Sequence, residues 1–170
     1  EKNEFLQNIR NTFENFFGED AKNKINLMNY LPEEKWLEIK KVGLLLPFLA
    51  EKLGAQYCIA LDNDEWCYQN CIGNIELNTA EKIQPEIGDL ELVKDKQFEI
   101  ILANIHRNFL VEHMHTLAAI LTLDGYLIVS RFYQEDVKII LDKALEHNLL
   151  ANYITAQHNY ACIVLQKNST

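Results

Sequence analysis

The sequence predicts an α/β fold in which a doubly wound, mainly parallel sheet is covered by helices on both faces. From about residue 36 onwards, apolar strands alternate with helical segments, and this alternation is typical of βαβ units. The clearest strands lack polar alternation, as expected for strands buried on both faces. Residues 151–167, ANYITAQHNYACIVLQK, divide into two strands around His158-Asn159 and predict a terminal antiparallel hairpin. Together these features indicate a Rossmann-like domain.

The first half of the chain supplies leading helices and the first βαβ unit. Residues 5–17 and 21–30 have apolar groups at helical spacing, and WLEIKKV over residues 36–42 indicates a weak strand. LLLPFLAEKL over residues 44–53 predicts a helix that Gly54 ends. Next come an apolar strand, QYCIALD, a helix, DEWCYQNCIGNIEL, and a short strand within KIQPEIGD, over residues 56–62, 64–77 and 82–89.

The second half continues the alternation. FEIILANI over residues 98–105 is the clearest candidate for a buried strand, and a helix over residues 108–122 is expected to stop near Asp124-Gly125. YLIVSRF over residues 126–132 predicts another strand, and residues 134–148 predict a helix whose acidic start favours its N-terminus. We therefore expect an N-terminal helical segment over residues 1–35, packed on the core, and a Rossmann-like domain over residues 36–170.

Composition limits the partners of this domain. The 170 residues are 48% hydrophobic and 24% charged, which indicates a globular chain with a sizeable core. The formal charge of −9 argues against direct nucleic-acid binding and suits a basic protein partner. No apolar run approaches the ~18 residues of a membrane span, and the first residues lack a secretory signal, so we expect a cytoplasmic protein without membrane contact.

The four cysteines are expected to be free, buried thiols of a reducing compartment rather than disulfides or zinc ligands. They form no C-x-x-C pair, and no histidine near Cys67 and Cys71 completes a ligand set. No metal site is therefore expected. The four residues are Cys58, Cys67, Cys71 and Cys162.

Polar residues follow three of the predicted strands, at the edge where doubly wound sheets bind ligands. Asp62 stands where an acid can accept hydrogen bonds from ribose hydroxyls; the alternative is that Asp62, Asn63 or Asp64 caps the following helix. Asp89 ends the next strand. Asn104 can donate and accept together, which suits the orientation of an amine or amino-acid group, or it satisfies the backbone of a turn.

With these strand ends in place, two segments resemble the S-adenosylmethionine-dependent methyltransferases. IALDNDEWCYQNCIGNIELN is similar to the I-D-x-D…N-x-x-x-N stretch of the family, and LANIHRN to the A-N-I that follows its fourth strand in one branch. That branch contains the bacterial enzymes that methylate the eleventh protein of the large ribosomal subunit. The resemblance covers about residues 43–167.

The resemblance implies roles for individual residues. Asp62 would hold the cofactor ribose, Asn63 would line the adenine, and Asp89 with Leu90 would close over its other side. Asn104, the candidate catalytic residue, and Ile105 would face the methionine part and the incoming amine. Gly43, which would directly follow the glycine-rich loop, joins the cofactor-binding set. Because such chemistry is mostly positioning of a nitrogen nucleophile, a missing general base is no objection.

The main departure from this family is the glycine-rich loop itself. None of the six glycines forms a G-x-G pair, and almost no residues are available for a βα connection between Val42 and Gly43, where ~2–6 are usual. The F-G-T-G-x-H segment expected after Phe17-Gly18 and a separate recognition domain are also lacking. Either a segment of the gene product is absent from this chain, or the loop is deleted in the protein.

Three functions follow from these features. The resemblance implies an S-adenosylmethionine-dependent methyltransferase that modifies a protein amine, with a basic ribosomal protein as an acceptor suited to the acidic charge. A non-catalytic binding or scaffolding module with a degenerate cofactor site is the alternative. A nicotinamide-dependent oxidoreductase is disfavoured, because it needs the same glycine loop and a proton donor for which the sequence offers no candidate.

Overall fold

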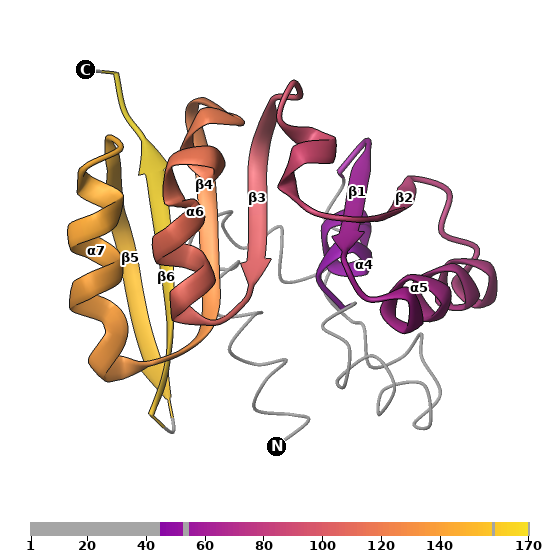
Figure 1. Ribbon diagram of the computed structural model, residues 1–170. Helices are drawn as coiled ribbons and strands as arrows, with labels where there is room; N and C mark the ends of the chain where they lie inside the picture. Colours follow the sequence, from indigo (N-terminus) through magenta and orange to yellow (C-terminus); the bar gives the residue numbers. More distant parts are fainter. Residues whose placement is uncertain (1–44, 53–54, 158, 170) are drawn as a thin grey trace. The chain divides into compact units, whose positions relative to one another are not determined.

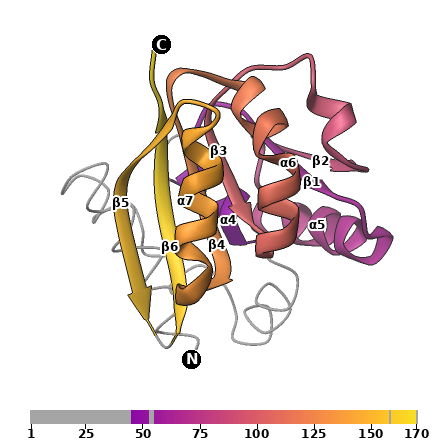
Figure 2. The same cartoon turned by 60° about the vertical axis from the view of Figure 1, so that its left-hand side comes forward.

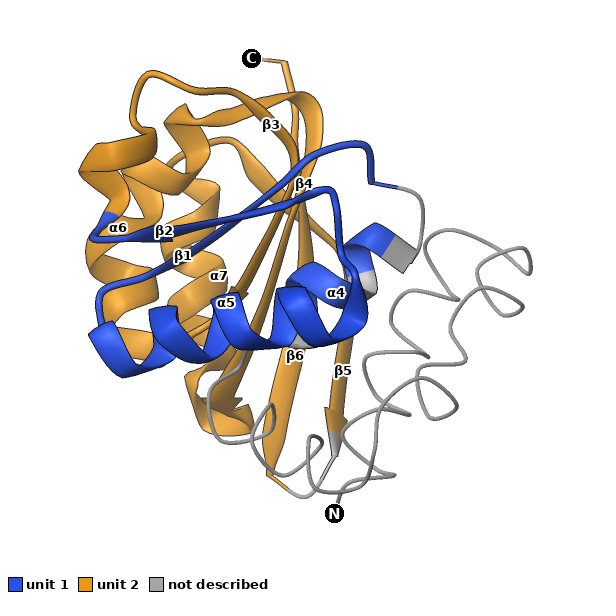
Figure 3. Cartoon of the chain, turned by 90° about the vertical axis from the view of Figure 1, so that its right-hand side faces the viewer, with its two compact units in different colours: residues 1–89 blue, residues 90–170 orange. Residues whose placement is uncertain are grey.

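The computed structural model describes residues 45–52, 55–157 and 159–169 (Figure 1). The helices expected over residues 5–17 and 21–30, the strand over 36–42 and Gly43 lie outside these residues, as does the expected domain boundary near residue 35. The chain divides into two compact units, residues 1–89 and residues 90–170, which are coloured separately in Figure 3. None of the described helices is long and apolar enough to cross a membrane.

The described part of unit 1 contains a two-stranded parallel sheet and two helices. Its elements follow the chain in the order α4 (Leu45–Lys52), β1 (Cys58–Asp62), α5 (Glu65–Asn78) and β2 (Ile83–Ile87). Strand β1 pairs with β2 in a continuous register that starts at Cys58 and Ile83 and ends at Asp62 and Ile87. The predicted helix and strands in this part of the chain are therefore confirmed within a few residues.

The expectation that β1 is buried on both faces is wrong. All five of its residues are half-buried, and β2 alternates irregularly between buried and exposed positions. Among the described residues, β1 forms hydrogen-bonded strand pairs only with β2. A strand in a two-stranded sheet has little opportunity to bury both its faces. The predicted stripe on α5 is confirmed at Cys71, which is buried, while Cys67 and Ile75 beside it are half-buried.

Unit 2 contains a four-stranded sheet whose order is β3-β4-β6-β5. The strands are β3 (Phe98–Asn104), β4 (Leu121–Tyr133), β5 (Leu149–Gln157) and β6 (Tyr160–Lys167), and the α-helices are α6 (Arg107–Ala119) and α7 (Val137–Leu145). Two short 3-10 turns, η2 (Leu90–Val93) and η3 (Gln134–Asp136), complete the unit. Strand β3 is parallel to β4, whereas β6 is antiparallel to both β4 and β5. The predicted hairpin is therefore confirmed.

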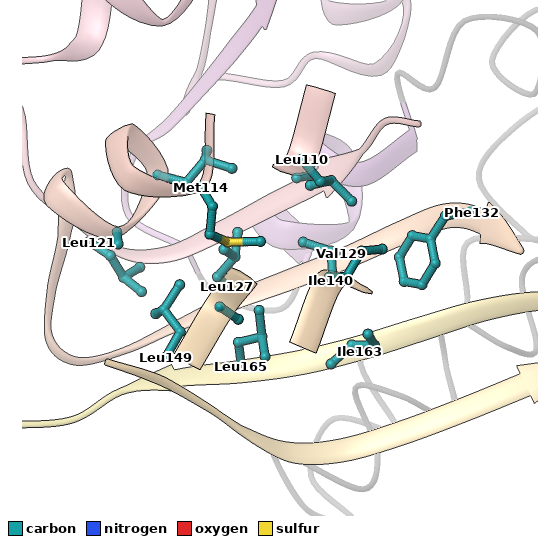
Figure 4. Packing of buried hydrophobic residues seen from close by; sticks show 14 of the residues in the cluster. Leu110, Met114, Leu121, Leu127, Val129, Phe132, Ile140, Leu149, Ile163 and Leu165 are labelled. Carbon is teal, nitrogen blue, oxygen red and sulfur yellow. The ribbon is translucent and has the colours of Figure 1, made fainter. Parts of the chain in front are cut away.

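The core of unit 2 lies between this sheet and helices α6 and α7, which both cover the same face (Figure 2). Leu110 and Met114 of α6 and Ile140 of α7 are fully buried against Leu127 and Ile163 of the sheet (Figure 4). Helix α6 has these residues at i, i+4 spacing, so one stripe of the helix supplies the contact. This apolar packing holds β3 and β4 in place, and their ends carry Asn104 and Tyr133.

Two predictions in this unit need correction. The helix expected over residues 108–122 ends at Ala119, and Leu121 already belongs to β4, where it pairs with Phe98 of β3. Strand pairing therefore takes residues that the apolar pattern alone gave to the helix. Strand β3 was expected to be fully buried, but only Ala103 is buried and Ile100 is 40% exposed. The two α-helices of unit 2 cover the same face of this sheet, and that face receives alternate side chains.

Candidate functional site

Asp62 and Asp64, at the carboxyl end of β1, accept hydrogen bonds from different backbone amides. The Asp64 carboxylate is the N-cap of α5 and accepts hydrogen bonds from the Trp66 and Cys67 amides at 2.8 and 3.1 Å. Asp62 uses one oxygen, Oδ1, to accept a hydrogen bond from the Asp64 amide at 3.0 Å. Of the three candidate caps, Asp62, Asn63 and Asp64, it is Asp64 that caps the helix. The Asp62 side chain also forms a hydrogen bond with the Cys67 thiol.

The ends of β1 and β2 meet directly. The Gly88 amide donates a hydrogen bond to the Asp62 carbonyl at 2.9 Å, one residue past the last pair of the ladder. Gly88 has a φ of 147°, a conformation that favours glycine, and it turns the chain from β2 towards Asp89. Asp62, the exposed Asn63 and the exposed Asp89 therefore lie at the same end of unit 1. Three of the predicted site residues are brought together here.

Burial and the carboxylates at this edge raise the pKa values of two nearby thiols. Burial, followed by the charge of Asp62 and Asp64, raises the pKa of the Cys67 thiol to about 11. Burial and then Asp62 raise the pKa of the Cys71 thiol to about 11 as well. Both cysteines are free, and both are protonated at neutral pH. They are poor nucleophiles, so the reactive character of this edge belongs to its carboxylates.

The predicted residues of unit 2 lie at the end of β3 and in the turn before it. Asn104 is the last residue of β3, pairs with Ser130 of β4, and is half-buried. Its side-chain amide forms no hydrogen bond with any residue that the structure describes, so the turn alternative lacks support. Ile105 and Leu90 are partly buried and pack against the core cluster. Their apolar contacts fix the backbone on either side of β3.

His106 has a structural role. It is the N-cap of α6, and its Nδ1 accepts a hydrogen bond from the Phe109 amide at 3.3 Å. An imidazole that accepts at Nδ1 carries its proton on Nε2, the nitrogen that is left for any further contact. The cap places the start of α6 immediately after Asn104.

The sequence did not predict the ion pair that joins α6 to the turn after β4. Arg107 Nη1 lies 3.0 Å from Asp136 Oδ1, and the Asp136 side chain is only 13% exposed. The other oxygen, Oδ2, accepts a hydrogen bond from the Tyr133 amide at 3.3 Å. Residues 107 and 136 are 29 positions apart, and no local pattern links them. The pair ties the segment that follows Asn104 to the segment that follows β4.

A hollow at the end of β4 also escaped sequence reasoning. Tyr133, Gln134, Glu135 and Asn159 line it, and the ring of Tyr133 stacks on that of Tyr160 with centroids 5.1 Å apart. A polar-aromatic run, RFYQED, preceded by an apolar strand was the available signal, because it places side chains at a strand's carboxyl end. No group of three potential metal ligands gathers anywhere in the described part of the chain.

Comparison with solved structures first defines the class of fold. The crystal structure of a ribosomal protein L11 methylase from Lactobacillus delbrueckii subsp. bulgaricus is similar with a TM-score of 0.71 at 22% identity, covering 76% of this chain and 67% of that one. A methyltransferase from Pyrococcus furiosus has a TM-score of 0.62 at 15% identity, covering 74% of this chain and 70% of its own. The fold is therefore the Rossmann-like fold found in methyltransferases, as the sequence predicted.

Sequence comparison then defines the family. The family model described as ribosomal protein L11 methyltransferase (PrmA) matches residues 43–168, and the chain belongs to this family. A ribosomal protein L11 methyltransferase from Bacteroides thetaiotaomicron is 36% identical over 138 residues, which are 81% of this chain and 49% of that protein. The one from Porphyromonas gingivalis is 37% identical over 120 residues, 70% of this chain and 41% of that protein. The chain spans at most about half the length of these relatives.

Proposed function

We propose that this chain forms the cofactor-binding and catalytic part of an S-adenosylmethionine-dependent methyltransferase that N-methylates a protein amine. The family membership of residues 43–168 and the methyltransferase fold support this proposal. The names of the relatives point to ribosomal protein L11 as the acceptor, and the formal charge of −9 suits a basic protein of this kind. Such an enzyme would act in the cytoplasm, where ribosomal proteins are made.

The observation that carries the proposal is the position of Asp62 at the carboxyl end of β1, next to a helix that Asp64 caps. Asp64 already satisfies the first amides of α5, so Asp62 is not needed as a helix cap. A carboxylate that stands at the end of a parallel strand and is not used as a helix cap matches the pair of hydroxyls on a ribose. Asp62 would hold the ribose of S-adenosylmethionine, with Asn63 and Asp89 beside the adenine. Leu90 would complete that side of the binding site.

The described residues fit the ribose and adenine part of the cofactor, and Asn104 fits the acceptor. When bound, S-adenosylmethionine supplies an activated methyl group. The Asn104 side-chain oxygen would accept a hydrogen bond from the acceptor amine, orienting the nitrogen lone pair towards that group. Ile105 would contribute an apolar wall next to it.

One observation favours a second candidate, a non-catalytic module that keeps the fold. The whole sequence contains no G-x-G, so the chain lacks the loop that ordinarily leaves space for the cofactor. In this case the domain would bind a partner through its surface and would show no measurable affinity for S-adenosylmethionine. The same binding experiment separates the two candidates.

Isothermal titration calorimetry with S-adenosylmethionine tests the proposal. We expect binding by the 170-residue chain and a loss on the order of 10- to 100-fold in affinity for Asp62→Asn, which keeps the shape but removes the charge. Asp64→Asn is the matched control, because asparagine is an equally good N-cap, and it should leave the affinity unchanged. Absence of binding by the unsubstituted chain would favour the non-catalytic module.

Methyl transfer to purified ribosomal protein L11 tests the acceptor. Asn104→Ala should reduce transfer from labelled S-adenosylmethionine on the order of 100-fold through loss of positioning. The affinity for S-adenosylmethionine should change much less, because the acceptor is the main partner of this amide. Equal losses of transfer and cofactor affinity would instead make Asn104 a cofactor ligand only.

A further inference from the structure

The hollow at the end of β4 lies within the same unit and along the same sheet edge as Asn104. It has a volume of about 470 Å³ and is lined by Tyr133, Gln134, Glu135 and Asn159. Asn104 pairs with Ser130, and β4 continues from Ser130 to Tyr133 before the chain turns. Parallel strands β3 and β4 present their carboxyl ends to the same edge. A ligand that fills the hollow therefore binds on the edge that carries the candidate catalytic amide.

Two stacked tyrosines beside this hollow offer aromatic surface. The rings of Tyr133 and Tyr160 are inclined by 30°, with centroids 5.1 Å apart, and each residue remains 51% exposed. The pKa of the Tyr133 hydroxyl is raised, first by its hydrogen bond to Tyr160 and also by the carboxylates of Glu135 and Asp136. The Tyr133 hydroxyl is thus neutral, in contact with Tyr160 and set in negative surroundings. Exposed aromatic rings with this environment attract cations.

The backbone around the hollow is braced from two sides. The Gln134 amide donates a hydrogen bond to the Asn159 carbonyl at 2.8 Å, which joins the hairpin turn to η3. Asn159 has a φ of 67°, a left-handed conformation that asparagine tolerates better than most residues. On the other side, the Asp136 carboxylate holds the Tyr133 amide and pairs with Arg107. The hollow is therefore a preformed feature of the turn.

Glu135 provides an uncommitted negative charge in this hollow. The neighbouring Asp136 is committed to Arg107 at 3.0 Å, whereas Glu135 forms no ion pair or hydrogen bond with any residue in the described part of the chain. Glu135 is exposed and lines the hollow together with Tyr133. A carboxylate near an aromatic face favours an ammonium group and repels a phosphate. Charge thus selects a cationic ligand over a nucleic acid.

We infer that the hollow formed by Tyr133, Glu135, Asn159 and the adjacent Tyr160 binds a lysine ammonium group of the protein acceptor. This inference rests on the proposed function and names the part of the surface that selects a basic acceptor segment. The tyrosine rings contact the ammonium group and its methylene stem, and Glu135 supplies the opposite charge. Gln134 and Asn159 lie on the rim, where they contact the peptide around the lysine.

NMR of chain carrying labelled tyrosine tests the inference directly. Titration with the tripeptide acetyl-Lys-Lys-Lys-amide should shift the ring signals of Tyr133 and Tyr160, and acetyl-Gln-Gln-Gln-amide should not. Glu135→Gln and Tyr160→Leu should each weaken the apparent affinity about three- to ten-fold. Tyr160→Phe keeps the aromatic face and should retain most of the binding. Glu112→Gln, an exposed charge removal on α6, is the matched control and should change nothing.

Two further measurements separate this inference from the proposed function. Asp62→Asn should weaken binding of S-adenosylmethionine and leave the lysine-dependent shifts intact, so a failed cofactor site does not hide the acceptor site. Equal shifts with the glutamine tripeptide, or full lysine binding by Glu135→Gln, would overturn the inference. Stronger shifts with a uridine hexanucleotide would also overturn it, because they would define a nucleic-acid surface.

Discussion

The two units of the chain differ in how much apolar surface they bury. Of the buried hydrophobic residues in the described part, Phe48, Cys71 and Ile83 belong to unit 1, and all the others belong to unit 2. Unit 1 contributes hydrogen-bonded polar groups at a strand end, whereas unit 2 contributes a continuous core beneath a four-stranded sheet. The comparison teaches that the large apolar core and the polar strand end with Asp62 reside in different units. We therefore expect mutations in unit 1 and mutations in unit 2 to affect different properties of the chain.

The largest effect is expected in the core of unit 2. Leu110→Ala removes a side chain that is 0% exposed, and the cavity and lost contacts should lower the free energy of unfolding by about 2–5 kcal/mol. Urea unfolding followed by circular dichroism measures this change. Leu123→Ala, at a position that is 58% exposed, should cost less than about 0.5 kcal/mol. Similar costs at the two positions would show that unit 2 is loosely packed.

Glycines in the two units differ in the space available for an added Cβ. A Cβ at Gly125 of β4 would lie 2.9 Å from the Thr122 carbonyl and 3.0 Å from the Glu99 carbonyl. Gly125→Ala should therefore cost about 1–3 kcal/mol in unfolding free energy. Gly73, inside α5 of unit 1, has nothing within 4 Å of such a Cβ, so Gly73→Ala should stabilise by about 0.5–1 kcal/mol. Thermal unfolding of both variants measures the two changes in stability. Changes of the same sign in the two variants would contradict the prediction.

The capping role of Asp64 predicts a smaller, local effect in unit 1. Asp64→Ala removes the acceptor for the Trp66 and Cys67 amides and should cost about 1 kcal/mol. Amide hydrogen exchange should locate the loss in the first turn of α5. Asp62→Ala removes the acceptor for the Asp64 amide and for the Cys67 thiol, neither of which caps the helix, and should cost less. A larger loss of stability for Asp62→Ala than for Asp64→Ala would show that Asp62, and not Asp64, caps the helix.

The smallest effect concerns thiol reactivity beside Asp62. Burial and the neighbouring carboxylates hold the pKa of Cys67 at about 11, so alkylation by iodoacetamide near pH 8 should be slow. Asp62→Asn removes one negative charge, lowers the pKa of the thiol and increases the thiolate fraction. We expect labelling of Cys67 to accelerate roughly two- to five-fold. Cys162 of unit 2 is the internal reference, and an equal acceleration there would indicate general unfolding.

Much of the framework could be predicted from the sequence because the relevant forces act between near neighbours. The apolar run before Asp62 and the apolar run before Asn104 each predicted a strand with a polar end, and both ends lie where expected. The choice between Asp62 and Asp64 as the cap could not be predicted. Aspartate is a good N-cap at either position, and only the backbone conformation decides which of the two carboxylates faces the first amides.

Long-range pairing explains the remaining errors. The end of α6 depends on the pairing of Leu121 with Phe98 across the sheet, and the apolar pattern of residues 108–122 suits a helix or a strand equally well. The half-burial of β1 and β3 depends on which neighbours cover each strand, which periodicity does not reveal. The ion pair between Arg107 and Asp136 joins segments 29 residues apart, so no local signal could announce it.

The sequence by itself determined the alternation of strands and helices, the terminal hairpin, the polar strand ends at Asp62 and Asn104, and the family. These depend on local periodicity and on motifs that lie within a few residues. Only the tertiary structure decided that Asp64, and not Asp62, caps α5. It also decided that Tyr133 stacks on Tyr160 beside Glu135. These features require distant segments or exact backbone angles, and the folded chain alone supplies both.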